Sequence, residues 1–108
     1  MDRLLRAGTR LDGMFCFNDV LAFGAIRAAA DHGVKVPDEL GVVGWDDVEE
    51  AAYSTPSLSS VRPDKAAIAG TAVEQLLAQI AGEPADRFEI LCGYQLVVRE
   101  SSSGRSGQ

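Results

Sequence analysis

Several residue types on which common functional sites depend are scarce in this chain. Only two cysteines and one histidine occur in its 108 residues. Cys16 and Cys92 lie far apart, each in an apolar, strand-like run, so we expect two buried, reduced thiols and no metal site. His32 precedes Gly33 at an expected helix end, where a cation complements the helix dipole, so a histidine-dependent nucleophile is not indicated. We therefore expect no catalytic residue, no metal and no cofactor.

Long hydrophobic runs and an excess of basic charge are also missing. No apolar stretch approaches the length needed to cross a membrane, and the first six residues are too charged for the apolar region of a signal peptide. The formal net charge is −6, from ten Lys and Arg against sixteen Asp and Glu. A surface that binds phosphate backbones needs clustered basic residues. We therefore expect no direct contact of this segment with nucleic acid or membrane, and a cytoplasmic location.

The chain does have a strand–helix–strand pattern. Its 46% hydrophobic content is typical of one soluble globular domain or of a piece of a larger one. Met14–Phe17 and Leu40–Trp45 are apolar runs of strand length, and Asp19–His32 between them has the pattern of a helix. We expect two neighbouring parallel strands, the second buried on both faces because its residues do not alternate. The fold class is therefore α/β, built on a parallel sheet with βαβ connections.

The other elements are shorter or lie towards the C-terminus. In chain order we expect the end of a helix at Met1–Ala7, a helical turn at Val48–Tyr53, an extended segment at Leu58–Arg62, a long helix capped by Asp64 and ending at Ala81, and strand-like runs at Phe88–Leu91 and Tyr94–Val98. Residues 101–108 are rich in Ser and Gly and predict a disordered tail.

Polar side chains follow both strands of the βαβ unit, at the sheet edge where open α/β proteins bind ligands. Asn18 follows the first strand, and Trp45 and Asp46 end the second. A carboxylate accepts from adjacent hydroxyls, an amide donates and accepts, and an indole offers a flat apolar surface. This set suits a small neutral polar ligand such as a sugar. The alternative is that Asp46 and Asp47 only cap the turn at Val48, while Asn18 and Asp19 cap the helix; an acidic metal or phosphoacceptor pocket has weaker support.

The helix Asp19–His32 has more apolar residues than contact with a sheet on one side requires. Its polar residues Arg27 and Asp31 share one stripe, and Phe23 flanks that stripe. Phe23 is therefore a candidate for contact with a partner, and packing in the core is the open alternative.

Four stretches together carry a family resemblance: FCFNDVLAFGA at 15–25, VPDELGVVGWDD at 36–47, AYSTPSLSSVR at 52–62 and VVRES at 97–101. In order and spacing they resemble the C-terminal part of LacI/GalR-type transcriptional regulators. The resemblance covers nearly the whole chain apart from the tail. It implies an incomplete lobe of the type I periplasmic-binding-protein-like fold, in which two α/β lobes joined by three crossovers enclose an effector cleft. Residues 1–100 would form the C-terminal portion of that domain, with second-lobe elements in 1–62, first-lobe elements in 63–92 and a return strand in 93–100.

The resemblance also implies roles for single residues. Asn18 and Asp46 match positions that hydrogen-bond the effector, and Trp45 matches their aromatic neighbour. The position of Pro63 is often a Gln that contacts ligand, so one side-chain hydrogen bond is lost here. Three further residues match the dimer interface of the family: Phe23, Arg27 and Tyr53.

The sequence therefore predicts a segment of a sugar-responsive regulator that contributes half of the effector cleft and a homodimer surface. It is not expected to be an enzyme. Operator DNA would be bound by an N-terminal domain that this truncated segment lacks, and the segment alone is not expected to bind effector normally. The runner-up is a fragment of a periplasmic-type sugar-binding protein of a transport system, and a small α/β hydrolase or phosphatase is a third interpretation.

Overall fold

A computed structural model describes residues 1–84 and 89–103 of the chain. The elements are α1 (Asp2–Arg6), β1 (Gly13–Phe15), α2 (Asp19–Asp31), β2 (Gly41–Trp45), the 3₁₀ turn η1 (Glu49–Ala52), β3 (Ser59–Pro63), α3 (Lys65–Ile80), β4 (Tyr94–Val97) and the 3₁₀ turn η2 (Glu100–Ser102). The four strands form one sheet in the order β1-β2-β3-β4. β1, β2 and β3 are parallel, and β4 runs antiparallel to β3. The predicted α/β class with a parallel βαβ unit is confirmed.

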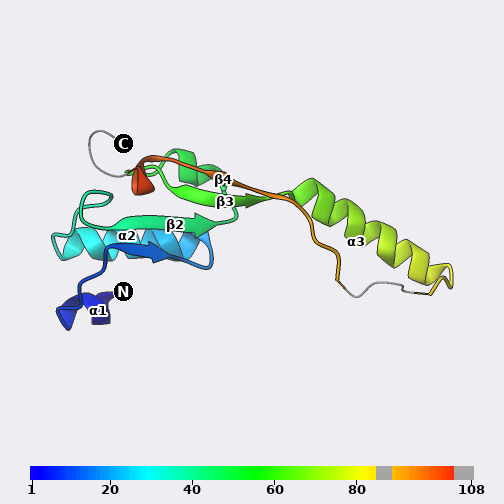
Figure 1. The fold of residues 1–108 in the computed structure, drawn as a ribbon, viewed down its shortest axis with the longest axis horizontal. Helices are drawn as coiled ribbons and strands as arrows, with labels where there is room; N and C mark the ends of the chain where they lie inside the picture. Colours follow the sequence, from blue (N-terminus) through cyan, green and yellow to red (C-terminus); the bar gives the residue numbers. More distant parts are fainter. Residues whose placement is uncertain (85–88, 104–108) are drawn as a thin grey trace.

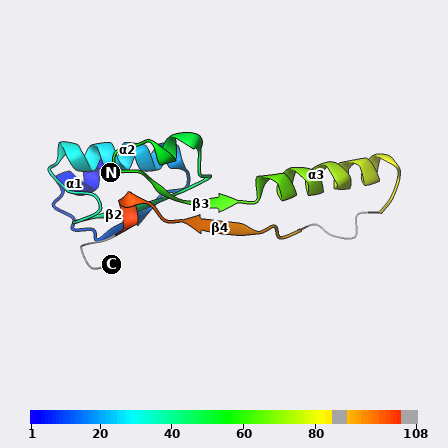
Figure 2. The same ribbon diagram turned by 90° about the horizontal axis from the view of Figure 1, so that it is seen from above.

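The core lies between α2 and one face of this sheet (Figures 1 and 2). The helix contributes small residues, Ala22, Ala25 and Ala29, which let its backbone approach the strands closely. The sheet and its connections contribute the larger side chains Cys16, Leu40, Val42 and Leu58, together with Ala51. The N-terminus of α2 is fixed by Asn18, whose Oδ1 accepts a hydrogen bond from the Leu21 amide at 2.8 Å, as helix-capping chemistry predicts.

The expectation that β2 is buried on both faces is wrong. Val42 and Gly44 are buried, whereas Val43 is half-buried and Trp45 is exposed. Figure 2 shows α2 and η1 on the same side of the sheet. Within the described residues no α-helix covers the opposite face, although η2 contacts β2, so the alternate side chains of β2 remain partly open to solvent.

The second long helix, α3, stands apart from this body. β3 and β4 run side by side away from the body and lead to it (Figures 1 and 2), which gives the chain extents of 58 × 31 × 20 Å. Its predicted cap is confirmed, since Asp64 Oδ1 accepts from the Ala67 amide at 3.0 Å. No residue of α3 is buried, and its apolar stripe, which includes Leu76, Leu77 and Ile80, is exposed.

Two predictions near the C-terminus need correction. Residues 89–91 of the expected strand Phe88–Leu91 are not in a strand, because β3 pairs with β4 only as far as Pro63–Tyr94; Phe88 lies outside the described residues. The disordered tail expected from residue 101 is wrong for 101–103, and 104–108 lie outside the described residues. Ser101 is fully buried, because its hydroxyl donates to the Val42 carbonyl at 2.6 Å and accepts from the Ser59 amide at 2.8 Å.

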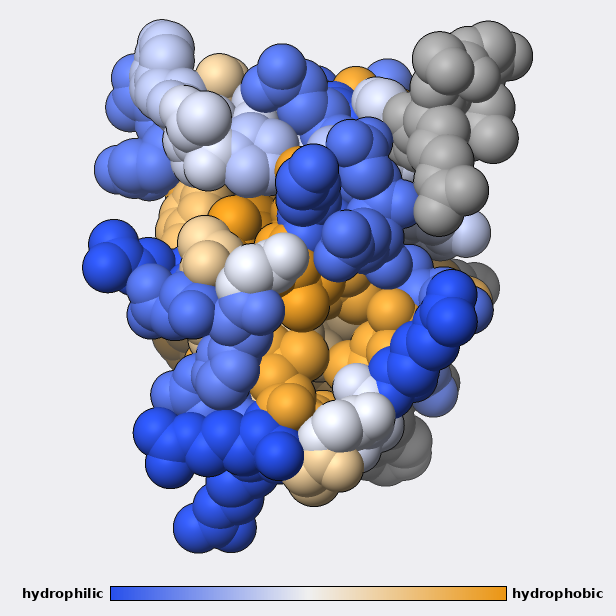
Figure 3. All heavy atoms as spheres, turned by 90° about the vertical axis from the view of Figure 1, so that its left-hand side faces the viewer, coloured by the Kyte–Doolittle hydropathy of each residue, from blue (hydrophilic) through white to orange (hydrophobic). Residues whose placement is uncertain are grey.

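Apolar surface also appears at the end of the body where α1 lies. Figure 3 looks onto this end and shows apolar side chains at the centre with hydrophilic ones around them. A cavity of about 330 Å³ lies here, lined by residues that include Leu5, Leu11, Val34 and Leu40. These residues flank the beginnings of β1 and β2, so this surface lies at the opposite sheet edge from the strand tips. No helix in the described ranges is both long and apolar enough to span a bilayer.

Candidate functional site

The tips of β1 and β2 lie at the same edge of the sheet. The two strands are parallel, with Phe15 opposite Val43, and the pairing continues with the Cys16 amide donating to the Val43 carbonyl at 2.9 Å. The rings of Phe15 and Trp45 meet edge to face with centroids 6.4 Å apart. Asn18 and Asp46 therefore follow neighbouring strand ends, in the arrangement that binds ligands in open α/β sheets.

The chain that follows β2 takes an uncommon backbone conformation. Asp46 and Asp47 have φ angles of 110° and 54°, and positive φ is unfavourable for residues other than glycine. Three consecutive amides hold this loop in place. Asp46 N donates to the Val61 carbonyl at 2.9 Å, Asp47 N to Ser60 Oγ at 2.9 Å and Val48 N to Asp19 Oδ2 at 2.8 Å. We call residues 45–48 the tip loop.

Asp19 holds the tip loop in place by a hydrogen bond to its last residue. Its side chain is fully buried, and it accepts from both the Val48 amide and the Ser60 hydroxyl, the latter at 2.7 Å. It does not cap α2, as one interpretation of the sequence had it; Asn18 does. A Cβ at Gly44 would overlap Asp19 Oδ1 and lie 3.2 Å from Leu58 Cδ2. The one signal of this role in the sequence is a glycine inside an apolar strand, which marks a close approach.

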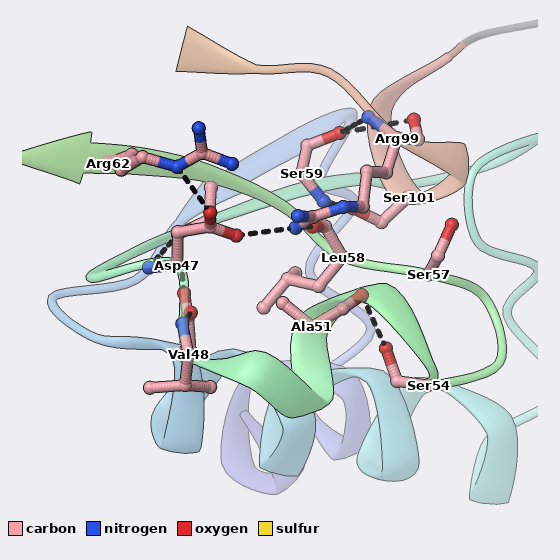
Figure 4. A network of polar contacts seen from close by, with 12 residues as sticks. Asp47, Val48, Ala51, Ser54, Ser57, Leu58, Ser59, Arg62, Arg99 and Ser101 are labelled. Atoms are coloured by element: carbon pink, nitrogen blue, oxygen red, sulfur yellow. Dashed lines mark hydrogen bonds and ion pairs between the residues drawn. The ribbon is translucent and has the colours of Figure 1, made fainter. Parts of the chain in front are cut away.

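Asp47 is shared by two arginines (Figure 4). Its Oδ2 accepts from Arg62 Nε, and its Oδ1 forms an ion pair with Arg99 Nη1, both at 2.7 Å. The side chain of Asp47 is only 7% exposed, against 49% for Arg62 and 18% for Arg99. Burial by itself raises the pKa of Asp47, but the hydrogen bonds and positive charges of Arg99 and Arg62 outweigh it and hold that pKa below its ordinary value. The proposal that Asp47 caps the turn at Val48 is therefore wrong.

The three predicted ligand residues differ in how they are engaged. The amide oxygen of Asn18 caps α2, while its side chain is half-buried. Trp45 is 38% exposed and lines a cavity of about 560 Å³ together with Pro63 and residues of α3. The Asp46 carboxyl has no partner within the described residues. The Asn18 amide thus follows β1, and the Trp45 indole and the Asp46 carboxyl lie at the end of the neighbouring strand β2.

The predicted dimer residues lie on the helical side of the body. Phe23 packs against the core and also lines a surface groove of about 390 Å³ between α2 and the 54–56 loop. Arg27 lines the same groove and forms an exposed ion pair with Asp31 at 3.0 Å. Tyr53 is 76% exposed. Phe23 therefore packs against the core, as one of the two interpretations expects, and its contact with a partner stays a prediction.

Metal-ligating side chains do not gather anywhere in the described part of the chain: no group of three or more His, Cys, Asp or Glu is placed to hold an ion. Cys16 is buried and Cys92 half-buried, and both are free thiols. Burial raises the pKa of Cys16, which keeps that thiol protonated and unreactive at neutral pH.

Comparisons of the sequence and of the structure with known proteins agree with one another. The sequence profile of the periplasmic binding protein-like domain matches residues 2–102. The HTH-type transcriptional regulator GntR of Pseudomonas aeruginosa is 41% identical over 100 residues, which are 93% of this chain and 29% of GntR. The chain thus spans about three-tenths of the length of the curated relatives it matches.

Solved structures show the same relationship. A putative LacI-family regulator from Sanguibacter keddieii superimposes with a TM-score of 0.87 at 41% identity, covering 95% of this chain and 39% of that one. A lac repressor dimer bound to operator and the anti-inducer ONPF superimposes with a TM-score of 0.84 at 31% identity, covering 94% of this chain and 35% of that one. These relatives are transcriptional regulators and not enzymes or transport proteins.

Proposed function

Because this chain belongs to the periplasmic binding protein-like domain family and matches a piece of LacI-type regulators, we propose that it forms one side of the effector cleft of such a regulator. The supporting observation is the arrangement at the strand tips. Trp45 ends β2, Asn18 and Asp46 follow the adjacent parallel strands β1 and β2, and the Asp46 carboxyl is left without a partner in the described residues.

The chemistry of this edge suits a sugar or a related small polar ligand. A carboxylate accepts hydrogen bonds from two neighbouring hydroxyls, and an indole packs on the apolar face of a ring. Pro63 lines the cavity beside Trp45 and has no side-chain donor or acceptor, so it adds apolar contact where a polar residue would add a hydrogen bond. An anionic ligand is disfavoured by the charge of Asp46.

The opposite side of the cleft would come from the second lobe. We assign residues 1–62 to one lobe, 63–92 to elements of the other, and 93–100 to the return strand. In support of this division, β3 and β4 carry the chain away from the body to α3, whose apolar stripe is exposed. A helix of 16 residues with no buried side chain lacks the packing from which helices in proteins gain most of their stability.

The regulator would act as a homodimer in the cytoplasm and bind operator DNA through a separate domain. The candidate dimer surface is the groove beside α2, with Phe23, Arg27 and Tyr53. Its position on the helical side of the body leaves the strand tips free for the effector. The solved lac repressor relative is a dimer bound to operator.

The single tryptophan of the chain provides the test, because Trp45 lies at the proposed site. We would fuse the chain to the remaining part of the GntR effector domain and titrate the fusion with a panel of sugars and nucleosides, following Trp45 emission and heat. At least one ligand should give a saturable change. Asp46→Asn should weaken that ligand by about tenfold or more, since a hydrogen bond to a charged group contributes about 1.5–3 kcal/mol.

The matched control is Glu49→Gln, which removes an exposed acidic charge from the neighbouring turn and should leave the affinity unchanged. The isolated chain should bind the same ligand far more weakly, because it supplies one side of the cleft. Micromolar binding by the isolated chain would contradict the need for a second wall. Equal affinity of the Asp46→Asn variant would contradict the assignment of the ligand site.

A further inference from the structure

The two strands that connect the body to α3 each bring an arginine to the tip loop. Arg62 is the fourth residue of β3, and Arg99 follows β4 by two residues. Arg62 therefore lies within β3, opposite Gln95 of β4, whereas Arg99 lies in the segment that follows β4. Figure 4 shows both side chains pointing towards the one carboxyl of Asp47.

The contacts divide that carboxyl between β3 and the segment after β4. Oδ2 is held by Arg62 and Oδ1 by Arg99, each at 2.7 Å. Arg99 is fixed further, since its Nη1 also donates to the Leu58 carbonyl at 2.7 Å and its backbone amide donates to Ser59 Oγ at 2.7 Å. Asp47 is therefore the residue at which the tip loop, β3 and the segment after β4 meet.

The position of this carboxyl bears directly on the effector site. Asp47 is bonded to Asp46, and the pair occupies consecutive positive-φ conformations. Such conformations persist only where the surroundings hold them, so a displacement of the Asp47 side chain changes the direction of the Asp46 side chain. Arg62 and Asp47 also line a cavity of about 660 Å³ with Pro63, Lys65 and Tyr94, at the point where β3 passes into α3.

We propose that Asp47 is a positioning residue that couples the effector loop to both connections with α3. A shift of β3 or of the segment after β4 moves an arginine, the arginine moves Asp47, and Asp47 reorients Asp46. By linkage the effect is reciprocal: a ligand that favours one orientation of Asp46 favours one arrangement of the two connections. The regulatory meaning rests on the effector site proposed above, whereas the coupling itself is a property of the unliganded chain.

The unliganded 108-residue chain is sufficient for the test. We would make Arg62→Gln and Arg99→Gln in the wild-type chain and again in the Asp47→Asn chain, and measure Trp45 emission and hydrogen exchange of the Val48 amide. In the wild-type background both substitutions should shift the emission and speed Val48 exchange, by about tenfold for Arg99→Gln because that contact is the less exposed of the two. In the Asp47→Asn background Arg62→Gln should add no further change, and Arg99→Gln should add less than it does in the wild-type background, because only its contact with the Leu58 carbonyl is then still lost. The control Arg10→Gln removes an arginine whose side chain is 92% exposed and should alter neither signal.

Two results would overturn the proposal. One is an unchanged Trp45 signal in the single arginine variants. The other is an arginine effect of the same size with and without the Asp47 charge, which would place the coupling in the backbone. If Asp47→Asn does not fold, a salt titration of the wild-type chain replaces it. Raising NaCl from about 0.05 to 1 M screens the half-exposed contact between Arg62 and Asp47, so the Trp45 emission of the wild-type chain should move towards that of Arg62→Gln. An emission that does not move would refute the positioning role of Asp47. No effector is added, so failure of the effector-site assignment would leave these results interpretable.

Discussion

Three acidic residues of the strand-tip region have three different surroundings. Asp19 is fully buried and accepts from the tip loop and from β3. Asp47 is nearly buried and neutralised by two arginines. Asp46, which precedes Asp47 in the tip loop, has no partner among the described residues. Two of the carboxyls therefore hold the loop, and the third is the one available to a ligand.

The lowered pKa of Asp47 makes a prediction about acid stability. A carboxyl that is more acidic in the folded chain contributes its full stabilisation above the ordinary carboxyl pKa of about 4, and that contribution is lost as the pH falls through the lowered folded value. We expect Asp47→Asn to reduce the free energy of unfolding by about 2 kcal/mol at pH 7, and the difference from wild type to shrink below pH of about 4.

Urea denaturation at several pH values measures this difference. Glu49→Gln, which removes an exposed acidic charge nearby, should follow the wild-type profile. A deficit of Asp47→Asn that stays constant down to the lowest pH would show that the loss comes from the geometry of the amide and not from the missing charge.

At the scale of the elements, α2 and β2 pack so closely at Gly44 that no larger residue fits between them. Gly44 lies in β2 directly against Asp19 at the start of α2, and there is no space there for a Cβ. The buried alanines of α2 belong to the same core cluster as Val42 of β2. This close approach is what allows the Asp19 carboxyl to reach the Val48 amide beyond the end of β2.

Gly44→Ala should therefore destabilise the chain by about 1–3 kcal/mol, as overpacking of a filled core does, and should also alter Trp45 emission because it displaces the anchor of the tip loop. Gly24→Ala is the matched control: its Cβ would meet nothing within 4 Å, and removing a glycine from a helix interior should stabilise by about 0.5–1 kcal/mol. Thermal unfolding followed by circular dichroism distinguishes the two. Equal melting temperatures would show that the sheet and α2 separate freely.

At the scale of the whole molecule, packing is distributed unevenly. α2 has four buried residues and α3 has none. Stability within a protein follows such differences in local burial, and isolated helices of this length are marginal in water. The chain therefore combines a packed body with a long helix that has no buried side chain.

Hydrogen exchange measured residue by residue should show this contrast. The amides of α3 should exchange about a hundredfold or more faster than those of the central turns of α2. Equal protection of the two helices at low protein concentration would contradict the difference in packing between α2 and α3. Protection of α3 that rises with concentration would instead identify a second copy of the chain as the surface that covers it.

Local patterns in the sequence determined the helix caps, the parallel βαβ unit and the family of this protein. Helix caps at Asn18 and Asp64 were predictable because capping depends on residues three positions apart. The parallel βαβ unit, and with it the shared edge of Asn18 and Asp46, followed from the spacing of apolar runs. The resemblance of four stretches to LacI/GalR-type regulators identified the family, which the profile over residues 2–102 supports.

Only the tertiary structure determined which contacts each carboxyl of the strand-tip region makes. Asp19 meets Ser60 across 41 positions, and Arg99 meets Asp47 across 52, and no local spacing encodes such contacts. The tail illustrates the same limit: a Ser-rich composition predicts disorder, yet Ser101 is buried because its hydroxyl takes the place of water for the Val42 carbonyl and the Ser59 amide. Composition describes what a segment would do in solvent, whereas burial depends on which distant backbone groups need a partner.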